Sequence, residues 1–259
     1  MQYVFKKFAW KLWVTTSYSG QTIIFVGTLE GGATNSFSPN SIHQVEDVLS
    51  LNGFDNKIAN LSGTSGTVSL GSNTLTLGNG NNNNVFGGAI TGTGGGITKV
   101  GNGDLTLTGA GLNTYTGTTT ISEGTLQAGG GTNALSPNSA IVLADTAGAT
   151  LTLIPPSDHT IASLAGGGTT GGNVVIGNNS TLTVGNSNNT TFAGSISGPG
   201  GAITKVGSGA LTLSGTNTYS GAINVVSGRL VVNGSISSST TTVGSGGTLK
   251  ELEQQVLSL

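Results

Sequence analysis

A phrase that occurs three times constrains this 259-residue chain more than any other feature. Each copy reads Tyr-(Ser/Thr)-Gly, then a short segment ending in Ile or Val, then Gly-x-Leu, and the copies begin at Tyr18, Tyr115 and Tyr219. The tyrosines are 97 and then 104 residues apart, and the spacing inside the phrase does not change. Recurrence at a long and nearly constant period is typical of proteins built from stacked repeats.

Other blocks of the chain match at a similar period. The offset between matching blocks drifts from 98 to 106 residues. Such drift is expected if the blocks are strands and the gaps are turns, because turns tolerate changes in length. The matching pairs are 34–41 with 132–139, 58–63 with 161–166, 97–101 with 203–207, and 105–107 with 211–213.

The composition indicates short strands separated by tight turns. Gly and Asn, which accept positive φ readily, cluster in segments such as 78–84 and 185–189. Between the clusters, segments such as 74–77 and 180–184 alternate apolar with hydroxyl side chains, as half-buried strands do. These regular segments argue against disorder, and no helix is predicted between residues 18 and 249. The strands predicted in the first unit are 22–26, 48–51, 58–61, 67–70, 73–77, 85–90, 97–100, 105–108 and 118–122.

Strands of this length fit a parallel β-solenoid with about 20 to 25 residues per coil. An antiparallel sandwich or barrel is the alternative, since it also uses short, evenly spaced strands. The low aromatic content of 5% favours the solenoid, whose thin interior has little room for large rings. Ladders of stacked Thr and Asn fit the same geometry. We therefore expect one all-β solenoid over residues 18–249, made of two repeats of 100 residues with partial copies.

Charge and cysteine content exclude several classes. With a net charge of −2 and scattered basic residues, the chain is not expected to bind nucleic acid. It has no cysteine, so there is no disulfide framework, and it has no apolar segment long enough for a membrane-spanning helix. Residues 1–17 form a basic, aromatic leader in which Lys11 interrupts the apolar run. We expect this leader to cover an open end of the stack, or to be an arbitrary start, rather than to act as a signal peptide.

The longest motif that is repeated within the chain resembles that of a known family. The segment Lys99–Gln127 and the segment Lys205–Leu230 both contain Lys-Val-Gly, Leu-Thr-Leu and Asn-Thr-Tyr-(Ser/Thr)-Gly in the same order. These residues resemble the passenger-associated transport repeat of bacterial autotransporters, over about 98–127 and 204–230. A third half-copy starts at Tyr18.

The resemblance implies a right-handed parallel β-helix that is exported by type V secretion through the outer membrane of a Gram-negative bacterium. In such proteins the repeat is associated with secretion of the passenger and not with chemistry. Compared with the family pattern, we expect two parts to be absent from these 259 residues, a clear signal peptide and the C-terminal β-barrel translocator. The last ten residues, 250–259, differ in composition from the rest, and we expect a short amphipathic helix or cap there.

No residue is expected to be catalytic, to bind a cofactor or to ligate a metal. His43 and His159 do not occupy equivalent places in the repeat, and we expect both to be solvated turn residues. Gly101–Asp104 is only faintly similar to a calcium-binding nonapeptide. The acidic residues are too dispersed in the sequence to indicate an active site; those considered are Asp55, Asp104, Asp145 and Asp158.

The sequence therefore favours a non-catalytic rod on the cell surface, a fragment of an autotransporter passenger that supports surface display and adhesion. Its expected partners are a host surface, extracellular matrix or a second copy of itself. Two alternatives stay open at this stage. One is a carbohydrate-active enzyme on a β-helix, which requires carboxylates about 5–10 Å apart. The other is a truncated gene remnant without a function of its own.

Overall fold

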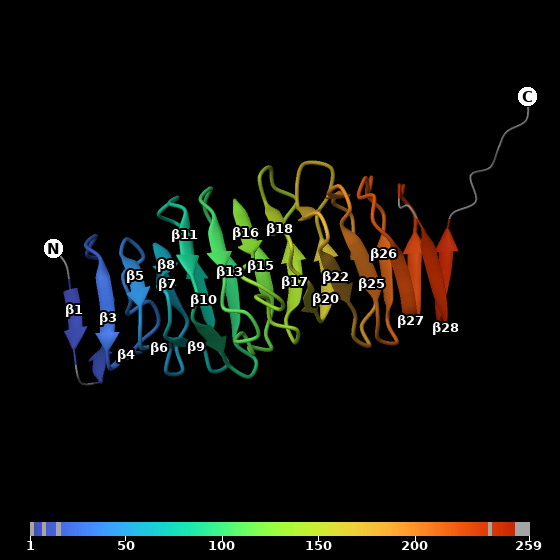
Figure 1. Cartoon of the computed structure of the whole chain (residues 1–259). Helices are drawn as coiled ribbons and strands as arrows, with labels where there is room; N and C mark the ends of the chain where they lie inside the picture. Colours follow the sequence, from blue (N-terminus) through green and yellow to red (C-terminus); the bar gives the residue numbers. More distant parts are fainter. Residues whose placement is uncertain (1–2, 7–8, 14–16, 238–239, 252–259) are drawn as a thin grey trace, which may run out of the picture.

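The computed structural model describes residues 3–6, 9–13, 17–237 and 240–251. All 24 strand pairings between its named strands are parallel, and the described residues contain no helix. The strands wind into a β-solenoid of about 11 turns, which lies as a rod with β1 and β28 at opposite ends (Figure 1). The predicted parallel solenoid is confirmed, and the antiparallel sandwich is wrong.

Each coil has three sides, so the rod has three faces. Face 1 consists of two hydrogen-bonded sheets that a bridge between Gly63 and Phe86 joins. Its strands are β1 (Tyr3–Lys6), β3 (Thr22–Val26), β5 (Ile42–Val45), β8 (Asn60–Ser62), β11 (Asn84–Phe86), β14 (Leu105–Leu107), β16 (Thr125–Ala128), β18 (Thr150–Leu153), β21 (Asn173–Ile176) and β24 (Ile196–Ser197).

Face 2 is interrupted in its middle, where the chain passes without regular strands. There Thr114 donates its N–H to Ile90 at 2.9 Å, and the Asn113 side chain donates to Ala134 at 2.7 Å. The strands of face 2 are β2 (Trp10–Leu12), β4 (Thr28–Gly31), β6 (Val48–Ser50), β9 (Thr67–Ser69), β12 (Ala89–Thr91), β19 (His159–Ile161), β22 (Thr181–Val184), β25 (Ala202–Lys205) and the first parts of β27 (Ile223–Val232) and β28 (Thr241–Glu251).

Face 3 is the most continuous face. It meets face 2 through β27 and β28, which bend around a corner without ending, so the two faces form one sheet there. The strands of face 3 are β7 (Asn56–Ile58), β10 (Thr74–Leu77), β13 (Gly96–Lys99), β15 (Thr119–Ile121), β17 (Ala140–Leu143), β20 (Ser163–Gly166), β23 (Thr190–Phe192), β26 (Ala210–Leu213) and the second parts of β27 and β28.

Two predicted strands are wrong in extent, because a corner divides each of them. Residues 58–61 belong to β7 and β8, with Ala59 at the corner, and residues 85–90 belong to β11 and β12, with two glycines between them. A corner that contains only small residues does not interrupt the apolar pattern. Such a corner therefore cannot be located from the sequence. The other predicted strands agree with the structure within one residue at each end.

Alternating side chains fill the interior. Along face 3, register places Leu77, Lys99, Ile121 and Leu143 directly above one another, all pointing inward. The apolar members of such ladders are almost fully buried, and each buried Leu or Ile contributes about 1.5–3 kcal/mol. Thr98 and Thr120 form the matching outward ladder on the same strands.

The glycine of the repeated phrase turns the corner after the first strand of each copy. Gly27, Gly124 and Gly228 all have positive φ, at 104°, 63° and 70°. A Cβ at Gly124 would lie 2.4 Å from the carbonyl oxygen of Gly101 in the coil below. The phrase therefore needs glycine here, because neighbouring coils approach too closely for a side chain.

Successive copies of the phrase lie on different faces. The first strand of the phrase is β3 on face 1, β15 on face 3, and the start of β27 on face 2. From one copy to the next, the chain passes twelve strands and two further sides without a strand, which makes 14 sides in each repeat. Because a coil has three sides, fourteen sides make four complete coils and two of the three sides of a fifth coil. Each repeat is therefore turned by two-thirds of a revolution and advanced by about 22 Å along the rod.

Residues 1–17 and 250–259 have no separate fold in their described parts. β1 pairs with β3 and β2 pairs with β4, both in parallel. Lys250 and Glu251 continue β28, whereas residues 252–259, where we expect an amphipathic tail, lie outside the described residues. The described part of the chain contains no helix long and apolar enough to span a bilayer.

Candidate functional site

The repeated phrase builds a buried chain of hydroxyl groups. In the second copy, the Tyr115 hydroxyl lies 2.7 Å from Thr119 Oγ1, which lies 2.8 Å from Ser139 Oγ. Ser139 also donates to the Gly117 carbonyl at 2.7 Å, so the chain links two coils. Burial raises the pKa of Tyr115 to about 12, although the hydrogen bonds with Thr119 and Ser139 act in the opposite direction.

The first copy has the same arrangement, but the third copy lacks it. Tyr18, Thr22 and Ser41 are joined at 2.7 and 2.9 Å. In the third copy Ile223 stands where Thr119 stands in the second, and the Tyr219 hydroxyl has no hydrogen-bond partner although its residue is 0% exposed. Burial raises the pKa of Tyr219. These hydroxyls therefore serve packing between coils, and the third copy does without them.

Two lysines point into the rod. Lys99 Nζ donates to the carbonyls of Val100 at 2.8 Å, Gly101 at 2.7 Å and Glu123 at 3.2 Å, which lie on two adjacent coils. Lys205 is its equivalent and donates to Val206, Gly207 and Ser227. Burial lowers the pKa of Lys99 to about 8, against the opposing influence of Asp104 and Glu123. Both ammonium groups hold corners together and are directed away from solvent.

Two asparagines play the same role at the interrupted sides. Asn113 Oδ1 accepts the Ile90 N–H at 2.7 Å, and Asn217 Oδ1 accepts the Ile196 N–H at 3.0 Å. Their side-chain amides donate to Ala134 and Ser235, one coil further on. Each side chain replaces the ladder hydrogen bonds that a strand would provide.

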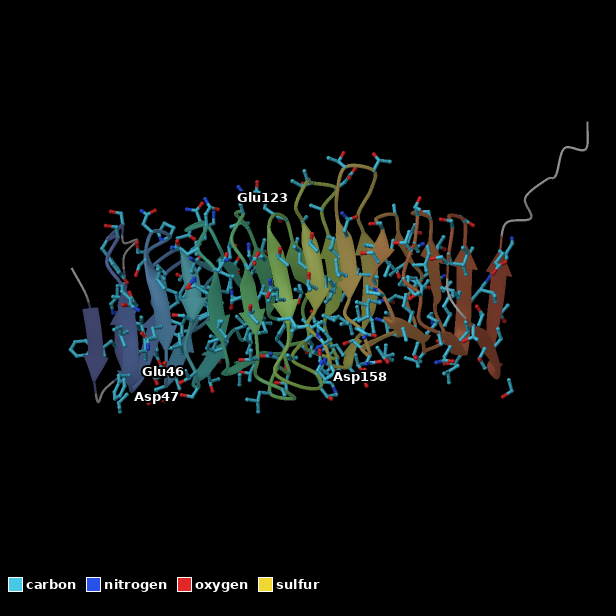
Figure 2. The ribbon with its side chains drawn as sticks, turned by 45° about the horizontal axis from the view of Figure 1, so that its top comes forward. Glu46, Asp47, Glu123 and Asp158 are labelled. Carbon is cyan, nitrogen blue, oxygen red and sulfur yellow. The ribbon has the colours of Figure 1, made fainter. Side chains whose placement is uncertain are left out.

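The carboxylates are occupied by backbone amides of neighbouring coils. Asp55 and Asp158 occupy equivalent positions, and each accepts the first N–H of a strand in the next coil, from Thr74 and Thr181, at 2.7 Å. Asp47 accepts the Gly27 N–H at 2.6 Å, and Glu123 accepts the Gly101 N–H at 3.0 Å. Figure 2 shows four acids at the edges of the rod, with Glu46, Asp47 and Asp158 on one side and Glu123 on the other.

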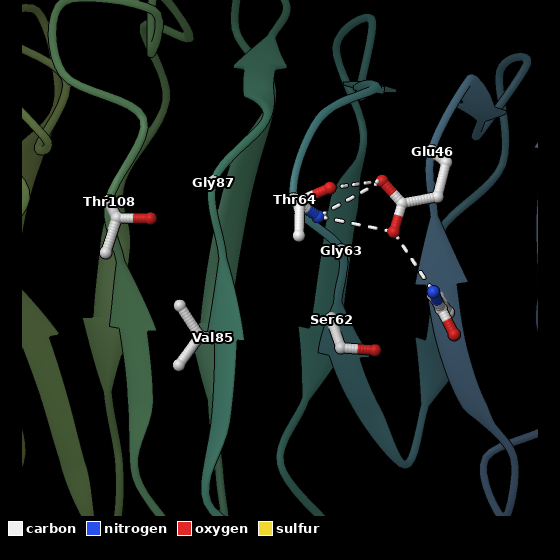
Figure 3. Close-up of a pocket in the computed structure, with 8 residues that line it drawn as sticks. Glu46, Ser62, Gly63, Thr64, Val85, Gly87 and Thr108 are labelled. Carbon is white, nitrogen blue, oxygen red and sulfur yellow. Dashed lines mark hydrogen bonds between the residues drawn. The ribbon is translucent and has the colours of Figure 1, made fainter.

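Glu46 lies at one end of a surface groove of about 410 Å³. Partial burial raises the pKa of Glu46, but hydrogen bonds from Gln44, Thr64 and Ser65 outweigh this effect, so the pKa lies below its usual value. Thr64 donates both its N–H and its hydroxyl, as Figure 3 shows. The groove crosses the ends of β5, β8, β11 and β14; its lining includes Ser62, Gly63, Val85, Gly87 and Thr108.

The prediction that His43 and His159 are solvated turn residues is wrong. Both lie in strands with their side chains buried, His43 in β5 and His159 in β19. His43 Nδ1 is 3.1 Å from the Ser41 carbonyl oxygen, and His159 Nδ1 accepts the Ala134 N–H at 3.1 Å. Burial lowers the pKa of each imidazole to about 4. Both rings are therefore neutral and have a structural role.

The described residues bring no acidic or basic cluster together. Within them, no group of three or more His, Cys, Asp or Glu side chains is arranged to hold a metal ion. Asp55, Asp104, Asp145 and Asp158 each accept a hydrogen bond from a nearby amide instead. Sequence reasoning missed the structural lysines, although one signal was available: Lys99 stands two residues after Ile97, in inward register.

Comparison with known proteins agrees with this geometry. A family model described as the passenger-associated transport repeat matches residues 97–128 and 203–232. These two segments contain the inward lysine, the bridging asparagine and the tyrosine of the phrase. The match thus covers some of the elements that occur twice in the structure.

A curated relative matches a longer stretch. The chain is 40% identical over 120 residues to a protein of Brucella suis biovar 1 (strain 1330) named adhesin BmaC autotransporter. The match covers 44% of this chain and 4% of the length of that protein. No solved structure gives a significant match. This chain is therefore a β-solenoid in which two segments match the passenger-associated transport repeat, and over 120 residues it is similar to a protein named as an autotransporter adhesin.

Proposed function

We propose that this chain is a segment of an autotransporter passenger that acts as a non-catalytic rod on the surface of a Gram-negative bacterium and supports adhesion. The family match and the relative named as an adhesin support the assignment. The observation that supports a non-catalytic role is that many ionisable side chains hydrogen-bond to the backbone of the rod. The buried lysines Lys99 and Lys205, the two histidines and several carboxylates are bound to backbone groups, which leaves them poorly placed for acid–base chemistry.

The outward surface fits an adhesive or spacing role. On face 3 the outward ladder is Thr76, Thr98, Thr120, Val142 and Ala165 over five consecutive coils, none of them charged. Solenoid proteins use extended surfaces along their stacked repeats to bind partners. Host matrix or a second copy of the chain are the partners that we propose.

The proposal is tested by displaying the rod on the surface of bacterial cells. Residues 18–249, fused to an outer-membrane translocator, are expected to reach the cell surface, where added protease removes them from intact cells. Cells that carry the rod are then expected to bind matrix-coated wells or one another more than cells that carry the translocator alone. Surface exposure without any binding would leave only a spacer role, and retention inside the cell would contradict the passenger assignment.

A further inference from the structure

The groove beside Glu46 occurs a second time. A separate surface groove of about 490 Å³ is lined by residues that include Gly168, Asn173, Ala193, Ser195 and Ser214. Matching the two repeats pairs Gly87 of the first groove with Ala193 of the second, and Thr108 with Ser214. The two grooves therefore share these two positions in the repeat.

Hydrogen bonds around the grooves confirm the correspondence. Thr108 donates its N–H to Phe86 at 2.9 Å, and its hydroxyl lies 3.5 Å from the same carbonyl oxygen. Ser214 makes the same two contacts with Phe192, at 2.9 and 3.4 Å. Both phenylalanines are completely buried, in strands with the same burial pattern.

Each groove also has a small residue at the same place, Gly87 in the first and Ala193 in the second. A Cβ at Gly87 would lie 2.8 Å from the Thr64 carbonyl oxygen, because neighbouring coils approach closely there. The second groove has no acid in its lining. Asp145 lies behind it, against Gly168, and accepts the N–H groups of Thr170 and Gly171 at 2.7 and 2.9 Å. Both Glu46 and Asp145 are thus bonded to amides of the next coil.

The lining defines the class of ligand. No Lys or Arg lines either groove, so neither offers a countercharge to phosphate, sulfate or carboxylate. The acids are occupied by amides, and Val85, 53% exposed, is the main apolar surface of the first groove. The remaining side chains are neutral donors and acceptors: Gln44, Ser62, Thr64 and Thr108 in the first groove, and Thr169, Asn173, Ser195, Ser214 and Thr216 in the second. Hydroxyl and amide groups of this kind match the hydroxyl groups of a neutral sugar.

We propose that each repeat carries a binding groove for a neutral oligosaccharide, so that this chain has two equivalent sites. The volumes lie within the range of about 300–1,000 Å³ that is usual for small-molecule sites. The first groove lies at the corner between faces 1 and 2, and the second at the corner between faces 3 and 1, because the repeat turns by two-thirds of a revolution. Two glycans are therefore bound from different sides of the rod, about 22 Å apart along it. This inference goes beyond the proposed function, which does not depend on it.

The test is a titration of the full chain with defined probes, followed by NMR and calorimetry. The probes are maltotriose, cellotriose and chitotriose as neutral glycans, a heparin tetrasaccharide as an anionic glycan, and a Gly-Ser peptide. We expect at least one neutral trisaccharide to bind with a stoichiometry of two, and the heparin tetrasaccharide and the peptide not to bind.

Groove-filling variants then assign the sites. Thr108→Tyr places a ring over the first groove, and Ser214→Tyr places one over the second. We expect each single variant to reduce the binding stoichiometry from two to one. The double variant should weaken binding of the trisaccharide at least tenfold. Thr98→Tyr and Thr204→Tyr add the same ring at equivalent outward positions of β13 and β25, which line neither groove, and should keep both sites. Circular dichroism checks that every variant is folded.

Binding of no neutral trisaccharide, or binding that the double variant leaves unchanged, would overturn the proposal. Preference for the anionic probe would overturn it as well. None of these results would affect surface display or adhesion to matrix, so failure of the groove proposal is distinguishable from failure of the proposed function.

Discussion

At the scale of single residues, polar groups in the interior act as ties between coils. Asn56 and His159 occupy equivalent positions, and each accepts an N–H from the coil before it, Phe37 for Asn56 and Ala134 for His159. An amide and an imidazole thus perform one task in the two repeats. The position requires a hydrogen-bond acceptor, and either an amide oxygen or an imidazole nitrogen can supply it.

The buried hydroxyl chain gives a first prediction. Thr119→Val removes the partner of the Tyr115 hydroxyl with little change in shape, and we expect the free energy of unfolding to fall by about 1–3 kcal/mol. Thr120→Val, on the outward side of the same strand, should change it by less than about 0.5 kcal/mol. Urea denaturation measures both. Equal effects of the two substitutions would contradict the role of the hydroxyl chain.

The two histidines give a prediction about pH. Burial lowers their pKa to about 4, whereas an unfolded histidine titrates near 6.5. Between these values the unfolded chain binds protons that the folded chain does not, so stability is complete above pH 6.5 and falls as the pH falls toward 4. The loss is expected to reach about 3 kcal/mol for each histidine.

Denaturation midpoints measured from pH 7.5 to 4 test this expectation. His159→Asn, which places in the second repeat the residue found at Asn56, should remove about half of the change that the histidines cause. The result that would contradict the account is a pH dependence that neither His159→Asn nor His43→Leu reduces.

At the scale of elements, the corners determine how strands stack. Lys99 stands in an inward ladder between Leu77 and Ile121, and its ammonium group bonds to corner carbonyls on two coils. Lys99→Met should fill the same space but leave those carbonyls unpaired, and we expect it to reduce stability by about 1–3 kcal/mol.

Replacement of lysine by methionine at two other positions provides the controls. Lys205→Met, at the equivalent corner, should have an effect of similar size, whereas Lys57→Met on the exposed surface should be nearly neutral. Thermal unfolding of the three variants measures the difference. If Lys99→Met were as mild as Lys57→Met, the corner bonds would not contribute to stability.

The strands themselves were predictable from the sequence, but the corners and inward polar residues were not. Segments such as 74–77 alternate apolar and hydroxyl side chains, which is enough to identify a half-buried strand. Ala59 continues the apolar pattern across a corner, so a bend there has no signature. His159, Lys99 and Lys205 are of types normally found at the surface, and partners in coils 22–25 residues away make their burial acceptable. His43 is buried with the Ser41 carbonyl oxygen, two residues before it, as its partner.

The candidate grooves were not predictable for a related reason. Each is assembled from residues of several coils, such as Ser62, Val85 and Thr108, and no single segment of the sequence contains the set. The repeats do predict that a groove formed by one unit has a counterpart in the other. Only the structure shows that the equivalent positions lie on different corners.

At the scale of the whole molecule, the rod is a sum of coils that contact only their neighbours. Thr183 and Thr204 are partners in register on adjacent coils of face 2. Deletion of residues 183–203 removes one complete coil and joins Leu182 to Thr204 without a change of face. We expect the shortened chain to stay folded, with a β-sheet circular dichroism spectrum, because solenoid stability is close to additive over its units.

Deletion of residues 183–193 removes about half a coil and is the control. The remaining strands would then point the wrong side chains inward, and we expect loss of the folded spectrum. A folded half-coil deletion, or an unfolded whole-coil deletion, would show that the coils are not the units of this fold.

Disulfide mapping tests the parallel winding most directly, because the chain has no native cysteine. Thr98 and Thr120 are partners in register on adjacent coils, with their Cα atoms about 4.8 Å apart, which is within the range of a disulfide. The double variant Thr98→Cys/Thr120→Cys is predicted to cross-link on mild oxidation, as is the repeat-equivalent pair Thr204→Cys/Asn224→Cys. Thr98→Cys/Val142→Cys, two coils and about 9.6 Å apart, is predicted to stay reduced. Cross-linking of the distant pair while both adjacent pairs stay reduced would contradict the account.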